Sequence, residues 1–310
     1  MLAIRVKTEN WQEYERISAD RLGELVARLG GVNDQFLAVD RIPERPSVFM
    51  QVARHSDGSY TLEHRDGSDS DVFGTDLPTD LPDAESVTRI MVAWARQEPD
   101  WDAGVVWSAR GLLSEEPVPE LDDKTREEIE EYVRGLITCG YDGLAQLAEA
   151  AEEWLVDGDE RPVSAAQARR IVDRLWLERV GEQARWVGET DPERITAVFA
   201  GLDARGIVAR ENFTCCRNCG LDEIGAEREA GDTREVRGFV FFHTQSTERV
   251  AAGGGLSLYY GGFDGSEETT AAVGGEVTAA LADAGLSVTW DGSPGAAIDV
   301  TGLDWRKRLG

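Results

Sequence analysis

Three of the four cysteines in the chain lie together at Cys215, Cys216 and Cys219, and His243 follows 24 residues after Cys219. Thiolate and imidazole side chains are the ligands that tetrahedral zinc prefers, and a Cys-x2-Cys spacing is common in zinc sites. The sequence therefore indicates a candidate zinc site formed by these four residues.

The candidate zinc set is incomplete by sequence alone. Adjacent residues on an extended strand point in opposite directions, so Cys215 and Cys216 can share one ion only where the chain turns. A further ligand would have to be Cys139, an acidic side chain such as Asp222 or Glu223, or water. With water in that position, the site would be open, as catalytic zinc sites are.

Two other interpretations of the cysteines stay open. The Cys216-x2-Cys219 pair suits thiol redox chemistry, because a helix N-terminus lowers the pKa of the first thiol in such a motif. That chemistry is typical of a βαβ setting, and we expect none around these residues. Alternatively, the thiols only pack as small apolar side chains beside Phe213 and Phe239. The sequence favours packing, then zinc, then redox chemistry.

His243 stands where a buried strand is expected to end and a helix to begin. Such a junction can gather polar groups into a small active site. Equally, the hydroxyl of Ser246 or Thr247 can cap the first helical turn, and the sequence favours this capping. No Ser-His-Asp or Cys-His-Asn arrangement can be placed from the sequence.

The cysteines and His243 must be positioned by a half of the chain that begins helical and then alternates strands with helices. Apolar residues recur there at helical spacing, and Ser164 with Gln167 forms a capping-box pattern. We expect helices over 122–138, 144–155, from 164, from 191 to 206, over 221–229 and from 266 to 285, with a helical turn or two over 247–252. We expect strands over 207–213, 239–242, 256–260, 286–290 and 297–300.

The first half of the chain predicts a small sheet covered by two helices. Residues 15–30 and 83–97 have the apolar spacing of helices, and residues 36–39 and 104–107 are short apolar strands. A hairpin is expected over 48–54 and 60–65, because the intervening Asp57-Gly58 tolerates the positive φ angles of a tight turn.

The elements together predict an α+β protein of two domains. Residues 1–112 form the small α+β module, an α/β sandwich in which the sheet lies against its helices. Residues 113–123 form an acidic linker that contains Pro117 and Pro119. Residues 124–310 form a helical segment followed by a mixed α+β sheet that carries the cysteines.

The chain carries 59 acidic and 32 basic side chains, a formal net charge of −27 that is spread over both halves. This charge excludes general binding to nucleic acid or to an anionic membrane, and it favours a basic or neutral protein partner. No apolar run is long enough to span a bilayer, and residues 1–10 lack the apolar core of a secretory signal. We therefore expect a cytoplasmic protein.

Several motifs resemble those of a known family. They are Asn-Phe-Thr-Cys-Cys-Arg-Asn-Cys-Gly over 212–220 and the stretches 238–248, 253–256, 290–294 and 303–309. Over roughly residues 120–310 the chain resembles the actinobacterial family known as domain of unknown function 6891, and the resemblance implies no activity. The first half resembles a module often found beside that family, and in size and acidity it is similar to bacterial immunity proteins.

The sequence therefore supports two functional hypotheses of different classes. The favoured one is a non-enzymatic binding or interaction protein, in the manner of an immunity protein, because both halves are acidic and no complete catalytic set is present. The alternative is a zinc-dependent or thiol-based enzyme that uses Cys215, Cys216, Cys219 and His243.

Overall fold

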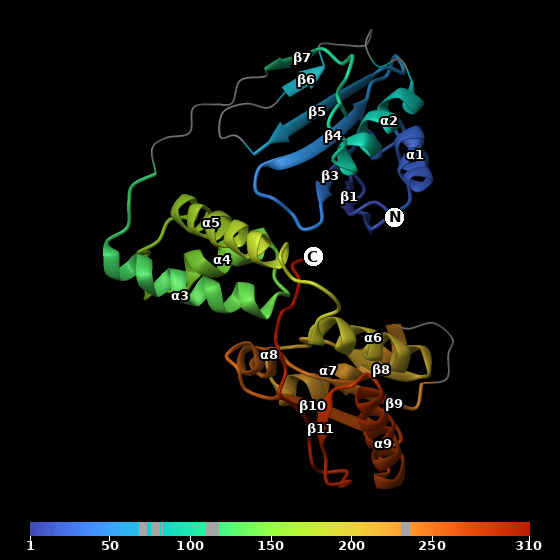
Figure 1. Ribbon diagram of the computed structural model, residues 1–310, viewed down its shortest axis with the longest axis vertical. Coiled ribbons are helices and arrows are strands. Elements are labelled where there is room, and N and C mark those ends of the chain that lie inside the picture. Colours follow the sequence, from blue (N-terminus) through green and yellow to red (C-terminus); the bar gives the residue numbers. More distant parts are fainter. Residues whose placement is uncertain (68–72, 76–80, 82, 110–117, 231–235) are drawn as a thin grey trace. The chain divides into compact units, whose positions relative to one another are not determined.

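The computed structural model describes residues 1–310 except 68–72, 76–80, 82, 110–117 and 231–235. Its contacts divide the chain into two compact units (Figure 1). The first comprises Met1–Asp122, Leu155–Val180 and Leu309–Gly310, and the second comprises Asp123–Trp154 and Gly181–Arg308. The predicted α+β fold in two parts is confirmed.

The exact domain boundaries stay a prediction, because much of the expected linker over 113–123 lies outside the described residues. None of the helices described here is both long and apolar enough to cross a membrane.

The described residues of the first unit form an antiparallel sheet in the order β2-β1-β3-β4-β5-β6-β7, with two helices packed on the same buried core. The predicted hairpin at Asp57-Gly58 is confirmed, with Gly58 at φ +88° between paired strands. The elements are β1 (Ile4–Thr8), β2 (Glu13–Glu15), α1 (Ala19–Arg28), β3 (Phe36–Arg41), β4 (Val48–Arg54), β5 (Tyr60–Asp66), β6 (Phe73–Thr75), α2 (Ala84–Ala95) and β7 (Trp107–Ala109). The sequence did not predict β1, β2 or β6.

Helix α5 (Ala165–Gln183) lies for most of its length in the first unit. It begins at the predicted capping box, where the Ser164 N–H donates to Gln167 Oε1 at 2.9 Å and the Gln167 N–H donates to Ser164 Oγ at 3.4 Å. Further along, the Trp176 indole N–H donates to the Glu44 carbonyl at 2.7 Å.

The second unit contains a mixed sheet in the order β11-β12-β10-β9-β8. Strands β8 and β9 are parallel, and the other neighbouring pairs are antiparallel. Its elements are α3 (Asp123–Cys139), α4 (Leu144–Glu153), α6 (Asp191–Ala204), β8 (Ile207–Arg210), α7 (Arg217–Ala230), β9 (Gly238–Phe241), α8 (Thr244–Ala251), β10 (Leu256–Gly262), α9 (Glu267–Asp283), β11 (Ser287–Thr289) and β12 (Ile298–Thr301).

Both faces of this sheet are buried at β9, which explains the unbroken apolar run there. Because side chains alternate along a strand, Phe239 and Phe241 face one side, where they pack with Ile224 of α7. Val240 and Phe242 face the other side, in a core shared with α6, α8 and α9. At β9, the sheet therefore lies between α7 on one face and α6, α8 and α9 on the other.

The C-terminal segment is anchored to this unit by its side chains, which accounts for the motif over 303–309. The buried Trp305 packs edge-on against Phe242, with ring centroids 6.5 Å apart. Arg308 donates from Nη1 to both carboxylate oxygens of Glu193, at 2.7 Å each.

We expect Arg308→Gln to lower the free energy of unfolding by about 1 kcal/mol at neutral pH, the upper range for a partly exposed ion pair. Burial raises the pKa of Glu193, but hydrogen bonds from the Thr190 N–H and from Arg308 outweigh it and hold this pKa below the ordinary value. A lowered carboxyl pKa stabilises the fold above the unfolded-state pKa and loses that contribution as pH falls through the folded-state pKa.

Denaturant unfolding of wild type and Arg308→Gln at neutral and acidic pH measures this contribution. The difference between them should shrink once the pH falls below the ordinary range of a glutamate. Arg205→Gln is the matched control, since Arg205 is exposed and makes no ion pair among the described residues. A difference that persists unchanged in acid would contradict the assigned role of Glu193.

Candidate functional site

The three neighbouring cysteines lie at the start of the helix that joins two parallel strands. Strand β8 ends at Arg210, α7 begins at Arg217, and β9 then pairs parallel with β8. This is a βαβ unit, in which the helix begins at the carboxyl edge of the strands. The expectation that no βαβ unit surrounds the cysteines is therefore wrong, and the main sequence argument against redox chemistry is removed.

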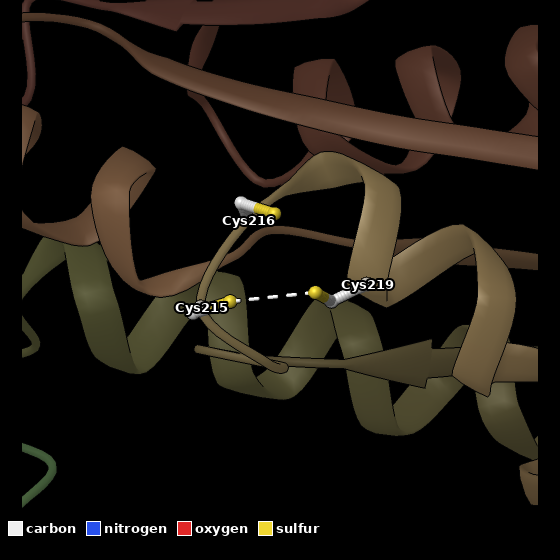
Figure 2. Close-up of side chains that lie close together, drawn as sticks. All are labelled: Cys215, Cys216 and Cys219. Carbon is white, nitrogen blue, oxygen red and sulfur yellow. Dashed lines mark hydrogen bonds between the residues drawn. The ribbon is translucent and has the colours of Figure 1, made fainter.

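The sulfur atoms of Cys215, Cys216 and Cys219 all lie within 4.8 Å of one another and could hold a metal ion. Figure 2 shows the side chains of Cys215 and Cys219 pointing toward each other, with their sulfur atoms 3.5 Å apart. The adjacent Cys215 and Cys216 converge because the chain turns just before them, with Thr214 at φ +58°. Cys215 is exposed, and the other two are half-buried.

Cys216 occupies the position that caps α7. Its carbonyl accepts the Gly220 N–H at 3.0 Å, and its sulfur accepts the backbone N–H of Cys219. That N–H, followed by the thiols of Cys219 and Cys215, holds the pKa of Cys216 below its usual value. Hydrogen bonds with Cys215 and Cys216 instead favour the neutral Cys219 thiol and raise its pKa to about 12. Cys216 therefore ionises more readily than an ordinary thiol, whereas Cys219 keeps its proton.

Hydrogen bonds from the start of α8 hold the loop that precedes the cysteines. The Thr244 N–H and Oγ1 both donate to the Thr214 carbonyl, at 3.1 and 2.9 Å. The fully buried Thr247 donates from Oγ1 to Asn212 Oδ1 at 2.8 Å. Asn212 and Thr214 both have positive φ, which is costly for a β-branched residue such as Thr214. The two threonines of α8 therefore stabilise a strained loop.

The same loop is held at its beginning by partly buried polar contacts. Tyr141 donates from its hydroxyl to Glu211 Oε2 at 2.6 Å, and Lys307 Nζ lies 3.1 Å from the same oxygen. The sequence did not identify Thr244, Thr247 or Glu211 as positioning residues. The only signal was the concentration of polar side chains after β9.

His243 is the N-cap of α8, so the prediction that Ser246 or Thr247 caps this helix is wrong. Its Nδ1 accepts the Ser246 N–H at 3.2 Å, and its ring stacks on Tyr259 at 5.2 Å between centroids. Burial, followed by the charge of Arg249, lowers the pKa of His243 and favours the neutral ring. His243 does not belong to the group formed by the three sulfurs.

The other proposed ligands do not reach the cysteine cluster. Cys139 lies at the buried end of α3, where burial raises the pKa of its thiol to about 11. Asp222 and Glu223 are exposed on α7 and do not belong to the group of three sulfurs. Among the described residues, the group that could hold a metal is thus limited to three cysteines.

A cavity of about 370 Å³ adjoins Cys216 and connects it with His243. Its walls also include Arg217, Arg249 and Tyr259, which the sequence did not single out. Arg217 is the first residue of α7, Arg249 lies in the last turn of α8, and Tyr259 comes from β10. The cavity thus depends on the same junctions as the cysteines.

A family model for a domain of unknown function, DUF6891, matches residues 122–309. The chain belongs to this family. Every cysteine of the cluster, the loop before it and the cavity beside it lie within the DUF6891 region. No curated protein and no solved structure matches the chain.

Gly220 of the DUF6891 region lets α7 approach β9 closely. A Cβ atom at this position would lie 2.3 Å from the ring of the fully buried Phe241. We expect Gly220→Ala to destabilise the protein by about 1–3 kcal/mol through overpacking, because either α7 or Phe241 must move. Displacement of α7 also displaces Cys219, so alkylation of the cysteine cluster should change.

Gly225→Ala on the same helix is the matched control, since a Cβ there meets nothing within 4 Å. It should be neutral or stabilise the protein by up to about 1 kcal/mol, as alanine favours helix over glycine. Thermal unfolding and thiol alkylation of both variants test the packing. Equal behaviour of the two variants would contradict the close approach of α7 to Phe241.

Proposed function

We propose that the DUF6891 region carries out thiol–disulfide exchange, with Cys216 as the attacking thiol and Cys219 as the resolving thiol. The observation that carries this proposal is the βαβ unit, in which Cys216 caps the connecting helix and Cys219 lies in its first turn. A helix N-terminus at the edge of a sheet supplies donors that stabilise a thiolate. Both thiols are partly exposed, and Cys216 lines a cavity.

The reaction proceeds in two balanced steps with a small disulfide as the oxidant. The Cys216 thiolate attacks one sulfur of the substrate, a protein–substrate S–S bond forms, and the other half of the substrate leaves as a thiolate that takes a proton from water. Cys219 then loses its proton to solvent and attacks the Cys216 sulfur. The mixed disulfide breaks, and the second half of the substrate leaves as a thiolate that takes a proton from water. The substrate has then gained the two electrons that the protein dithiol has lost.

Cys215 offers a second possible disulfide and leaves the stoichiometry of the reaction unchanged. Cys219 lies close to both Cys215 and Cys216, so it can form an intramolecular disulfide with either one. A direct bond between the adjacent Cys215 and Cys216 would require a further change in the local backbone. Each intramolecular disulfide that the cluster can form without such a change therefore includes Cys219.

Reaction of the reduced protein with bis(2-hydroxyethyl) disulfide, followed by mass spectrometry, tests the proposal. We expect wild type to lose two hydrogen atoms without retaining an adduct. Cys216→Ser should slow the reaction at least about tenfold, because the stabilised thiolate is lost. Cys219→Ser should accumulate a mixed disulfide on Cys216, and Cys215→Ser should still close the Cys216–Cys219 bond.

Cys139→Ser is the matched control, because the Cys139 thiol is buried and its raised pKa disfavours the thiolate. This variant should react like wild type. An undiminished rate in Cys216→Ser, or no trapped adduct in Cys219→Ser, would overturn the assigned roles.

Zinc binding by Cys215, Cys216 and Cys219 is the second candidate, favoured by the mutual proximity of all three sulfurs. Zinc–sulfur bonds of about 2.3 Å in a tetrahedron place sulfur atoms about 3.8 Å apart, close to the Cys215–Cys219 separation of 3.5 Å. Three protein ligands would leave a fourth position for water or a substrate, as in catalytic zinc sites.

Metal analysis of protein purified without chelators separates the two candidates. The zinc hypothesis expects about one zinc per chain, lost in Cys216→Ser and Cys219→Ser, and thiols that become alkylated only after a chelator is added. Zinc below about 0.2 per chain, with the stability of Cys216→Ser unchanged, would exclude it. Wild-type thiols that react at once, with or without chelator, support the exchange reaction.

The remaining expectations from the sequence stay predictions. They include a non-enzymatic interaction with a basic or neutral protein, an immunity-like role, a cytoplasmic location, an actinobacterial origin and the kinship of residues 1–112 with a module found beside this family. The charge of −27 supports the first of them. We place thiol chemistry ahead of this non-enzymatic interaction because the cysteines lie in a βαβ unit.

A further inference from the structure

The cavity beside Cys216 has a composition that differs from the rest of this acidic protein. Its volume is about 370 Å³, and its eight described lining residues include two arginines and no acidic side chain. The whole chain, by contrast, carries nearly twice as many acidic as basic side chains. The lining residues are Cys216, Arg217, Asn218, His243, Gln245, Ser246, Arg249 and Tyr259.

Arg217 is the cation best placed to meet a ligand. Its guanidinium carbon lies 5.2 Å from the centroid of the Tyr259 ring, its side chain is exposed, and in the described part of the chain it forms no ion pair. Arg217 also follows Cys216 directly in sequence. A negative group bound by Arg217 would therefore lie close to the attacking sulfur.

Arg249 adds positive charge but is already engaged. It donates from Nε to the Gly255 carbonyl at 2.9 Å and bonds to Ser257 Oγ, and Asp299 lies 3.9 Å away. Its guanidinium is thus fixed against the strand and partly neutralised. This position of Arg249 explains Gly254, because a Cβ there would lie 2.8 Å from Arg249 Cγ.

The N-termini of α7 and α8 add to the positive charge of the arginines at the cavity. Arg217 and Asn218 begin α7, while Gln245 and Ser246 lie in the first turn of α8. The positive ends of helix dipoles favour anions, and their effect adds to that of Arg217. The neutral form of His243, favoured by burial, neither adds a charge nor repels an anion.

We propose that this cavity binds the negative group of the substrate, so that the preferred substrate is a small disulfide bearing a carboxylate. The inference rests on the proposed thiol–disulfide exchange and specifies its substrate class. Electrostatic attraction to Arg217 holds the carboxylate while the disulfide faces the Cys216 sulfur. The neighbouring residues thus select an anion in a protein whose overall charge repels one.

Three disulfides of similar size and different charge test the inference. They are the dianion 3,3′-dithiodipropionate, the neutral bis(2-hydroxyethyl) disulfide and the dication cystamine. Each rate constant for the reduced protein at low salt is divided by that of a free model thiol with the same disulfide, which removes differences in intrinsic reactivity. If the net charge of the protein alone set the normalised rates, cystamine would react fastest and the dianion slowest. We expect the dianion to react fastest instead.

Arg217→Gln keeps a long polar side chain and removes the charge. It should lower the normalised rate for the dianion about fivefold more than the rate for the neutral disulfide, since only the dianion loses a charge interaction with Arg217. Arg205→Gln removes the same charge from a residue that lines a different cavity, and it should change neither rate. Added salt should weaken the preference of wild type for the dianion.

Two outcomes overturn the inference, and they are distinguishable. Normalised rates that follow net charge in wild type and are unchanged in Arg217→Gln overturn the assigned substrate class and leave thiol–disulfide exchange intact. Failure of Cys216 to react with the neutral disulfide overturns the exchange reaction and, with it, the substrate class.

Discussion

The parallel pairing of β8 with β9 is the constraint on which the candidate site depends. Parallel neighbours end at the same edge of a sheet, so the segments that leave them begin close together. One segment leads through the cysteine loop to α7, and the other leads through His243 to α8. The Phe213 N–H donates to the Phe242 carbonyl at 2.8 Å, which extends the contact just beyond the strands. An antiparallel pairing would have placed the two helix starts at opposite edges.

The cysteine loop is stabilised from outside because its own backbone is strained. Positive φ at Asn212 and Thr214 disfavours the loop, and a free segment of this sequence would not be held in that conformation. Thr244 and Thr247 offset the strain by bonding to these two residues, while Lys307 and Tyr141 hold Glu211. The thiols consequently meet in one fixed arrangement, so little conformational entropy remains to be lost when one of them reacts.

The sequence predicted the elements whose signal is local, and it failed where pairing between distant segments decides the outcome. Helical periodicity located α3, the Asp191-Pro192 start and Gly206 located α6, and the Asp57-Gly58 turn located the β4–β5 hairpin. Nothing local in the four residues of β8 indicates that they pair with β9 in the parallel sense. The βαβ unit was missed for that reason, and the proximity of Arg217 to His243 could not be expected. The cysteines were found because their residue type and spacing carry the chemistry by themselves.

The net charge of −27 disfavours a thiolate, yet the pKa of Cys216 is lowered. The distances over which the two effects act explain why both are true. A negative protein disfavours one more anion, but charges beyond about 8–10 Å are screened at physiological salt. Hydrogen bonds from the Cys219 N–H and the neighbouring thiols act at contact distance, where screening is weak. The thiolate is therefore governed by its immediate donors and not by the distant acids. The same separation of ranges allows the cavity, whose described lining has no acidic side chain, to attract an anion. Its arginines and helix ends act over a few ångströms, whereas the acidic surface acts through screened solvent.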